Sequence, residues 1–124
     1  MTKMLLVIDD NHDLCELIAD AAEIFGWNCQ TTTTPDAFFA ALTPEVALIL
    51  LDLMMPEMDG VELLGLLGER RCSTPIVVMS GVGKNTLENA ETLARTLGLT
   101  IAGHLQKPFQ LTQLEAVLEH VSQS

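Results

Sequence analysis

The chain has 124 residues, 48% of them hydrophobic, which is enough for the core of one folded domain and excludes an intrinsically disordered chain. Six Lys and Arg against 17 Asp and Glu give a formal net charge of −11, the wrong sign for neutralising the phosphates of a nucleic acid or an anionic membrane. We therefore expect a single domain over residues 1–124 that binds neither nucleic acid nor membranes directly.

The first predicted elements are a strand and a helix. Residues 4–8 form a short apolar run of strand length, too short for a signal peptide or a membrane span. After it, apolar residues recur with helical spacing; Asn11 or Asp13 can cap this helix and Gly26 can end it. The apolar positions of the helix are Leu14, Leu17, Ile18, Ala21 and Phe25.

A weaker strand and a short helix come next. Residues 28–33 are only weakly apolar and contain a run of β-branched threonines, which predicts an edge or half-exposed strand. Thr34 followed by Pro35 is typical of an N-cap and the first residue of a helix, which we expect to run to Leu42.

Two further strands are expected in the centre of the sheet. Residues 46–51 and 76–79 are continuous apolar runs, as strands buried on both faces require. Between them, Asp59 and Gly60 open a third helix that runs through Leu67, and we interpret Asp59 as its cap rather than as a reactive group.

The last part of the chain predicts a helix, a short strand and a final helix. Residues 102–106 lie between a glycine-containing break and Pro108, which predicts the fifth strand. In the final helix, Thr112 and Glu115 have the spacing of a capping box. The alternation of five strands with five helices predicts an α/β fold with a parallel sheet covered on both faces. The apolar positions of the fourth and fifth helices are Leu87, Ala90, Leu93, Ala94 and Leu97, and Leu111, Leu114, Val117, Leu118 and Val121.

The three cysteines indicate the compartment. Cys15, Cys29 and Cys72 are an odd number without CxxC spacing, so the sequence predicts neither a disulfide framework nor a zinc site. A reducing environment, and hence a cytoplasmic location, is expected.

Reactive side chains follow four of the five strands. Asp9 and Asp10 follow the first strand, Asp52 the third, Ser80 the fourth and Lys107 the fifth. Because ligands of an open parallel sheet bind beyond the carboxyl ends of its strands, we expect these side chains to meet at one edge. Three carboxylates held together either raise a pKa or bind a cation, and oxygen ligands favour Mg²⁺. A carboxylate there can attack phosphorus when cations offset the charge of the transferring group.

These residues resemble the signature of response-regulator receiver domains, the CheY-like family of two-component signalling. The resemblance covers nearly the whole chain and implies a flavodoxin-like (βα)5 three-layer sandwich with a five-stranded parallel sheet. It implies a signalling switch rather than an enzyme, phosphorylated by a sensor histidine kinase or a phosphotransfer protein. The segments that carry it are Asp9-Asp10, LDLMMPEMDG at residues 51–60, Ser80-Gly81 and Lys107-Pro108-Phe109.

The resemblance also implies a role for each site residue. Asp52 is the phospho-acceptor, and Ser80 and Lys107 contact the phosphoryl group. Asp9, Asp10, Asp52 and the backbone carbonyl of Met54 hold Mg²⁺. The Lys107-Pro108 peptide bond is expected to be cis. Phosphorylation is expected to switch the surface of the fourth helix, fifth strand and fifth helix for a downstream protein target, or for an output domain on a separate or truncated chain.

Three positions depart from the family's usual pattern. His104 stands where the family usually has an aromatic switch residue, and it is interpreted either as a pH-sensitive switch or as a partly buried filler. Met54 and Val82 are apolar at positions where polar side chains can orient the hydrolytic water, which predicts slow self-dephosphorylation. Residues 97–109 are also similar, more weakly, to receivers that precede cyclic-di-GMP phosphodiesterase (EAL) domains.

Three other functions fit these residues less well. A receiver-like interaction module that is never phosphorylated stays an alternative, although the complete charged set argues against it. A phosphohydrolase of the haloacid dehalogenase type needs a second acid two residues after the nucleophile, where this chain has Met54. A flavin carrier needs a hydroxyl- and glycine-rich loop after the first strand, where this chain has acids.

Overall fold

The structure, a computed structural model, describes residues 3–55, 58–81 and 84–122, with side chains of the last range from Leu87 onward. Within these ranges five strands alternate with five helices, as predicted. The strands are β1 (Lys3–Ile8), β2 (Trp27–Thr32), β3 (Val46–Asp52), β4 (Ile76–Ser80) and β5 (Ile101–Gln106). The helices are α1 (His12–Ile24), α2 (Pro35–Ala41), α3 (Gly60–Glu69), α4 (Lys84–Thr96) and α5 (Leu111–Ser122).

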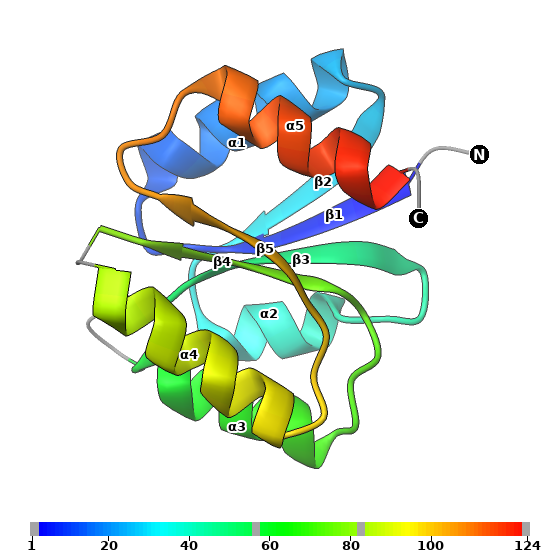
Figure 1. The fold of residues 1–124 in the computed structure, drawn as a ribbon. Helices are drawn as coiled ribbons and strands as arrows, with labels where there is room; N and C mark the ends of the chain where they lie inside the picture. The colour runs from blue at the N-terminus through cyan, green and yellow to red at the C-terminus, as the bar shows by residue number, and fades with distance from the viewer. Residues whose placement is uncertain (1–2, 56–57, 82–83, 123–124) are drawn as a thin grey trace.

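The strands form one parallel sheet in the order β2-β1-β3-β4-β5. The weakly apolar β2 lies at an edge, and the continuous apolar runs β3 and β4 lie inside the sheet, which confirms both predictions. Helices α1 and α5 cover one face and α2, α3 and α4 cover the other (Figure 1). The fold is therefore the flavodoxin-like three-layer sandwich.

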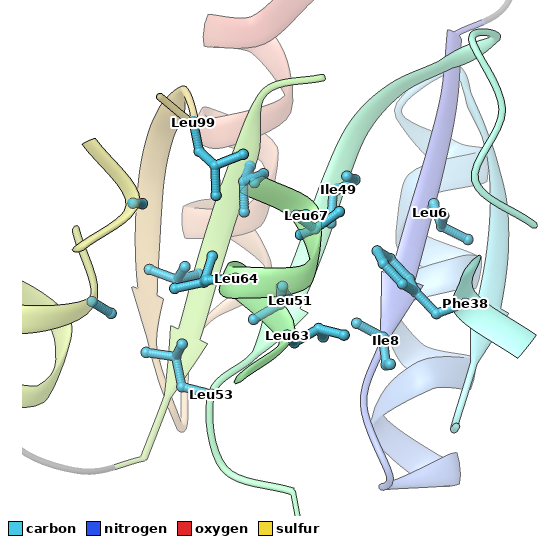
Figure 2. Packing of buried hydrophobic residues seen from close by; sticks show 14 of the residues in the cluster. Leu6, Ile8, Phe38, Ile49, Leu51, Leu53, Leu63, Leu64, Leu67 and Leu99 are labelled. Carbon is cyan, nitrogen blue, oxygen red and sulfur yellow. The ribbon is translucent and has the colours of Figure 1, made fainter. Parts of the chain in front are cut away.

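Each face of the sheet has its own apolar core. Alternate residues of β1 and β3 point to opposite faces, so Leu6 and Ile49 pack under α2 and α3, while Leu5 and Leu50 pack under α1 and α5. Figure 2 shows the first of these clusters, with Phe38 of α2 and the leucines of α3 directed at the central strands. Each such side chain contributes about 1.5–3 kcal/mol by its burial.

The helix boundaries follow mostly from the predicted caps. Asn11 accepts a hydrogen bond from the backbone N–H of Leu14, and Thr34 and Asp59 cap α2 and α3 in the same manner. Gly26, with φ of 87°, ends the turn after α1 in the left-handed region that favours glycine.

The predicted capping box of α5 is wrong. The helix begins at Leu111, one residue before Thr112, so Thr112 and Glu115 both lie inside it. Instead, the side chain of Gln113 accepts a hydrogen bond from the backbone N–H of Gln110 at 2.7 Å. The reaching-back interaction of a capping box is present, but it is shifted by two residues.

A close backbone approach joins residues 53–54 to residues 59–60. The N–H of Gly60 donates to the carbonyl of Leu53 at 3.2 Å, and Met54 forms an isolated antiparallel bridge with Asp59. A Cβ at position 60 would lie 2.5 Å from the Cα of Leu53, so only glycine fits there. This closure places Met54 directly beside the carboxyl end of β3.

Candidate functional site

The acidic residues predicted at the strand ends meet at the carboxyl edge of the sheet. Asp9 and Asp10 follow β1 and Asp52 ends β3, and one oxygen of each carboxylate lies within 4.8 Å of the others. Asp9 and Asp52 are buried, whereas Asp10 is exposed. Two carboxylates are thus withdrawn from water and the third faces solvent at the mouth of the site.

Both buried carboxylates are fixed by the backbone that follows them. Asp9 Oδ1 accepts the N–H of Asn11, and Asp52 Oδ1 accepts the N–H of Met54, each at 3.0 Å. Each aspartate therefore bonds to the backbone two residues ahead, the pattern of an Asx turn. These bonds leave the second oxygen of each carboxylate free to face the other charged groups.

Lys107 connects the two buried carboxylates. Its Nζ lies 2.6 Å from Asp9 Oδ2 and 3.3 Å from Asp52 Oδ2. The backbone N–H of Lys107 donates to the carbonyl of Ser80 at 2.8 Å, which ties the end of β5 to the end of β4. The Lys107-Pro108 peptide bond is cis, as predicted. The side chains of Asp9, Asp10, Asp52 and Lys107 are thus brought together, and Ser80 joins them through its backbone carbonyl.

The electrostatics of the site follow from burial and charge. Burial raises the pKa of the Asp52 carboxyl from 3.8 to about 6; the Asp9 charge adds to this effect, while the Met54 N–H and Lys107 oppose it. Burial alone would lower the pKa of Lys107, but its hydrogen bond to Asp9 and the charge of Asp52 outweigh burial and raise it. Lys107 is therefore a permanent cation at neutral pH.

The site carries more negative charge than its own cation can balance. Lys107 neutralises one of the three carboxylates, which leaves an excess of acid in a largely buried position. Carboxylate oxygens are hard donors of the kind that Mg²⁺ prefers. The residues present therefore fit a divalent cation. The role of the Met54 carbonyl as a metal ligand stays a prediction.

His104 lies on β5, but its ring is not a buried filler. The side chain is 57% exposed and its Nδ1 lies 3.0 Å from Glu91 Oε1 on α4. The other oxygen of Glu91 lies 3.6 Å from Arg95, one turn further along the helix. The interpretation of His104 as partly buried is thus wrong, because the adjacent Glu91 holds the ring at the surface.

Three residues contact members of the candidate site although the sequence pattern assigned them no role there. Asn11 was expected only as a cap, yet its N–H also holds Asp9; an aspartate followed by a turn is the signal for such a bond. The thiol of Cys15 donates to the carbonyl of Asp9 at 3.4 Å. Burial raises the pKa of Cys15 to about 11, so it stays a neutral donor. No sequence pattern points to Cys15, or to Glu91 as the partner of His104.

Met54 and Val82 are the two positions predicted to govern dephosphorylation. The Met54 side chain is 54% exposed beside Asp52, as an apolar group open to solvent. Val82 lies outside the described residues.

Comparisons with known proteins decide the family. The sequence model for the response regulator receiver domain matches residues 5–119. The chain belongs to the response regulator receiver family. A response regulator from Colwellia psychrerythraea is 28% identical with a TM-score of 0.86, each chain being covered completely. The chemotaxis response regulator CheY4 of Vibrio cholerae, 21% identical with a TM-score of 0.80 over 98% of this chain and 99% of that one, shares the fold.

Curated relatives of this receiver are longer. The response regulator SaeR of Staphylococcus aureus (strain USA300) is 26% identical over 110 residues, which are 89% of this chain and 46% of that protein. The chain thus spans about half the length of the curated relatives it matches. In the described part of the receiver, no helix has both the length and the apolar character needed to cross a bilayer. The weaker resemblance to receivers that precede cyclic-di-GMP phosphodiesterase domains stays a prediction.

Proposed function

We propose that this receiver accepts a phosphoryl group on Asp52 from the phosphohistidine of a sensor histidine kinase or phosphotransfer protein. The observation that carries the proposal is the contact of Lys107 with both Asp9 and Asp52 at the buried carboxyl edge of the sheet. A buried carboxylate beside a fixed cation and two further acids has no role in packing the core. It does have the charges that phosphoryl transfer to a carboxylate requires.

The free oxygen of Asp52 is the proposed nucleophile. Asp52 Oδ1 is occupied by the Met54 N–H, so Oδ2, the oxygen that faces Lys107, forms the new bond to phosphorus. The bond between phosphorus and the donor nitrogen breaks, and its electron pair stays on the imidazole of the donor. Lys107 then exchanges its contact with Asp9 for a phosphoryl oxygen, and the Ser80 hydroxyl donates to another.

Asp9, Asp10, Asp52 and the Met54 carbonyl are the proposed Mg²⁺ ligands. When bound, Mg²⁺ supplies the positive charge that offsets the transferring group and the acids around it. The exposed position of Asp10 leaves the mouth of the site open to an ion from solvent. Asp9, already held by Asn11 and Lys107, acts on the ion through a water in this proposal.

The phosphorylated state is proposed to alter the surface formed by α4, β5 and α5. The modification adds about −1.5 to −2 charges beside Lys107 and Ser80, which favours their movement toward the phosphoryl group. Because Lys107 follows β5 directly and Ser80 ends β4, that movement acts on the strand that carries His104. A difference of about 1–3 kcal/mol between the two arrangements is enough for a switch.

The biological setting is part of the proposal. The output is through protein contacts, to a downstream protein or to an output domain on the same or a separate chain. A cytoplasmic location suits the three cysteines, all of them free thiols. The apolar Met54 beside Asp52 supports slow self-dephosphorylation, since its side chain cannot hold a water for attack.

Intact-mass analysis tests the proposal. The protein is incubated with Mg²⁺ and a small-molecule phosphoryl donor such as an acyl phosphate, with an Asp52→Asn variant and an EDTA sample as matched controls. We expect one phosphoryl adduct on the protein with the original sequence in Mg²⁺, and none on the Asp52→Asn variant or in the EDTA sample. An adduct of equal yield on the variant would refute the assignment of Asp52. No adduct on any sample, with the kinase or without it, would favour the interaction module that is never phosphorylated.

A further inference from the structure

A second surface feature lies at the other end of α1, away from the acidic edge. A hollow of about 540 Å³ opens between the end of α1, the start of β2 and the side of α5. Helices α1 and α5 lie next to each other on the same face of the sheet (Figure 1). The hollow is lined by Ile24, Phe25, Gly26, Trp27, Glu115, Leu118, Glu119 and Ser122.

The hollow has an apolar floor and an apolar rim. Trp27 and Leu118 form buried parts of its lining, and Ile24 stands beside them with 81% of its side chain exposed. Among the aliphatic side chains of the described residues, Ile24 is the most exposed of the large ones. An isoleucine kept in water gains about 1.5–3 kcal/mol when a partner covers it fully.

Four acidic side chains lie around this apolar group. Asp20 lies one turn before Ile24, Glu23 lies next to it, and Glu115 and Glu119 line the hollow from α5. Within the described ranges none of these four carboxylates makes an ion pair. Lys3 contacts two residues that line the hollow: its Nζ donates to the carbonyls of Val121 and Ser122 and lies 5.9 Å from the Trp27 ring, and within the described residues it forms no ion pair with these four acids.

The end of helix α1 adds to the negative potential. A helix C-terminus carries a partial negative charge and is stabilised by a cation in the last turn. The last turn of α1 contains no basic residue and contains Glu23 instead. The negative end of α1 therefore adds to the charge of Glu23 beside the exposed isoleucine.

We propose that this hollow docks a basic amphipathic helix of a partner protein. An apolar side chain of the partner enters the hollow beside Ile24, and Lys or Arg residues flanking it pair with Glu23, Glu115 and Glu119. A second copy of this chain is a poor occupant, because a two-fold contact would set the same acids against one another in a chain of net charge −11. Charge complementarity therefore selects a cationic partner.

The docking surface is separate from the phosphorylation site. Helix α1 has 13 residues, so Ile24 lies about 20 Å from the end that begins beside Asp9 and Asp10. The hollow shares α5 with the surface that the proposed switch acts on, but its other lining residues belong to the end of α1 and the start of β2, and none belongs to α4 or β5. Binding there is expected to be the same whether or not Asp52 is phosphorylated, which makes the hollow a constitutive attachment point.

The test uses three synthetic peptides of one length and the intact chain labelled with ¹⁵N. One peptide has leucines at helical spacing with lysines elsewhere; the second has glutamates in place of the lysines; the third has the first peptide's composition with the leucines grouped at one end. Amide shifts at physiological salt locate the binding and give its Kd. The lysine helix is expected to shift the amides of residues 20–27 and 115–122, and the other two peptides are expected to bind at least about tenfold more weakly.

Matched variants make the location falsifiable. Ile24→Ser is expected to weaken binding about tenfold, and Glu119→Lys about threefold. Val61→Ser and Glu69→Lys, which change an exposed valine and an exposed acid of α3 in the same ways, should leave the Kd within twofold of the original.

Three results would overturn the docking proposal: equal binding of the grouped-leucine peptide, shifts centred on Asp9 and Asp10, or an Ile24→Ser variant that binds like the original. Phosphorylation measured on the same samples keeps the two proposals distinguishable. An adduct on Asp52 without peptide binding would refute only the docking proposal. Peptide binding without an adduct would refute only the proposed phosphorylation of Asp52.

Discussion

Replacing Asp52 with asparagine is expected to raise the free energy of unfolding of the metal-free protein at neutral pH. The carboxyl is 1% exposed and lies close to the Asp9 and Asp10 carboxylates, so its ionised form is costly to bury. Its pKa is raised from 3.8 to about 6, chiefly by burial, and this value already includes the opposing effect of Lys107. Asparagine keeps the shape and can still accept the Met54 N–H.

The sign and size of this stabilisation follow from the pKa of Asp52 in the unfolded and in the folded chain. Below pH 3.8 the carboxyl is protonated in both the folded and the unfolded chain. Between pH 3.8 and about 6 the unfolded chain releases its proton while the folded chain keeps it, so the contribution of Asp52 to stability falls as the pH rises. A pKa difference of about two corresponds to about 3 kcal/mol. We therefore expect Asp52→Asn to stabilise the metal-free protein by about 1–3 kcal/mol above pH 7.

Urea unfolding in EDTA at pH 7.5 and pH 5 measures this effect. The stabilisation by Asp52→Asn should be present at pH 7.5 and smaller at pH 5, where the folded carboxyl is mostly protonated. Added Mg²⁺ should stabilise the unmodified protein, by about 2.7 kcal/mol at 100 times its Kd, and the variant by less. A variant that is less stable than the unmodified protein at pH 7.5 without metal would refute the reasoning.

Three further predictions concern the loop after β3, the phosphoryl lifetime and the cysteines. Gly60→Ala should lower the free energy of unfolding by at least about 2 kcal/mol, because its Cβ would meet the Leu53 backbone. Gly65→Ala, which has open space in α3, should be neutral or stabilise by up to about 1 kcal/mol. Urea unfolding of both variants measures the difference, and equal effects would contradict the packing argument. Met54→Asn should shorten the lifetime of the phosphoryl adduct about tenfold in a mass-spectrometric time course, and an unchanged lifetime would count against a role for this side chain. Alkylation of the folded protein at pH 8 should spare Cys15 and Cys29, since burial raises their pKa values to about 11 and about 12; rapid labelling of either, located by peptide mapping, would show that it is open to solvent.

The fold was predictable because its signals are local. Continuous apolar runs marked the inner strands β3 and β4, and threonines marked the edge strand β2. The caps Asn11, Thr34 and Asp59 marked where three helices begin. The start of α5 was misplaced because two overlapping segments, at Gln110 and at Thr112, offer polar side chains at the same spacing, and the helix uses the first of them.

The sequence predicted which residues form the site, but not which of them contact one another. Strand ends of a parallel sheet meet at one edge, so the residues after β1, β3, β4 and β5 had to converge. That Lys107 lies closer to Asp9 than to Asp52 depends on the path of the chain after β5, which spacing does not reveal. The outward position of His104 likewise depends on Glu91, a contact across 13 residues that links α4 to β5.

The most direct test of the central claim locates the phosphoryl group on the chain. The phosphorylated protein is treated with borohydride, which reduces an acyl phosphate to an alcohol, and is then digested and sequenced by mass spectrometry. The account predicts that Asp52 alone is converted to homoserine, in samples that contained Mg²⁺ and not in samples that contained EDTA. Conversion at Asp9 or Asp10, or a phosphoryl group on a histidine or serine with Asp52 unchanged, would contradict it.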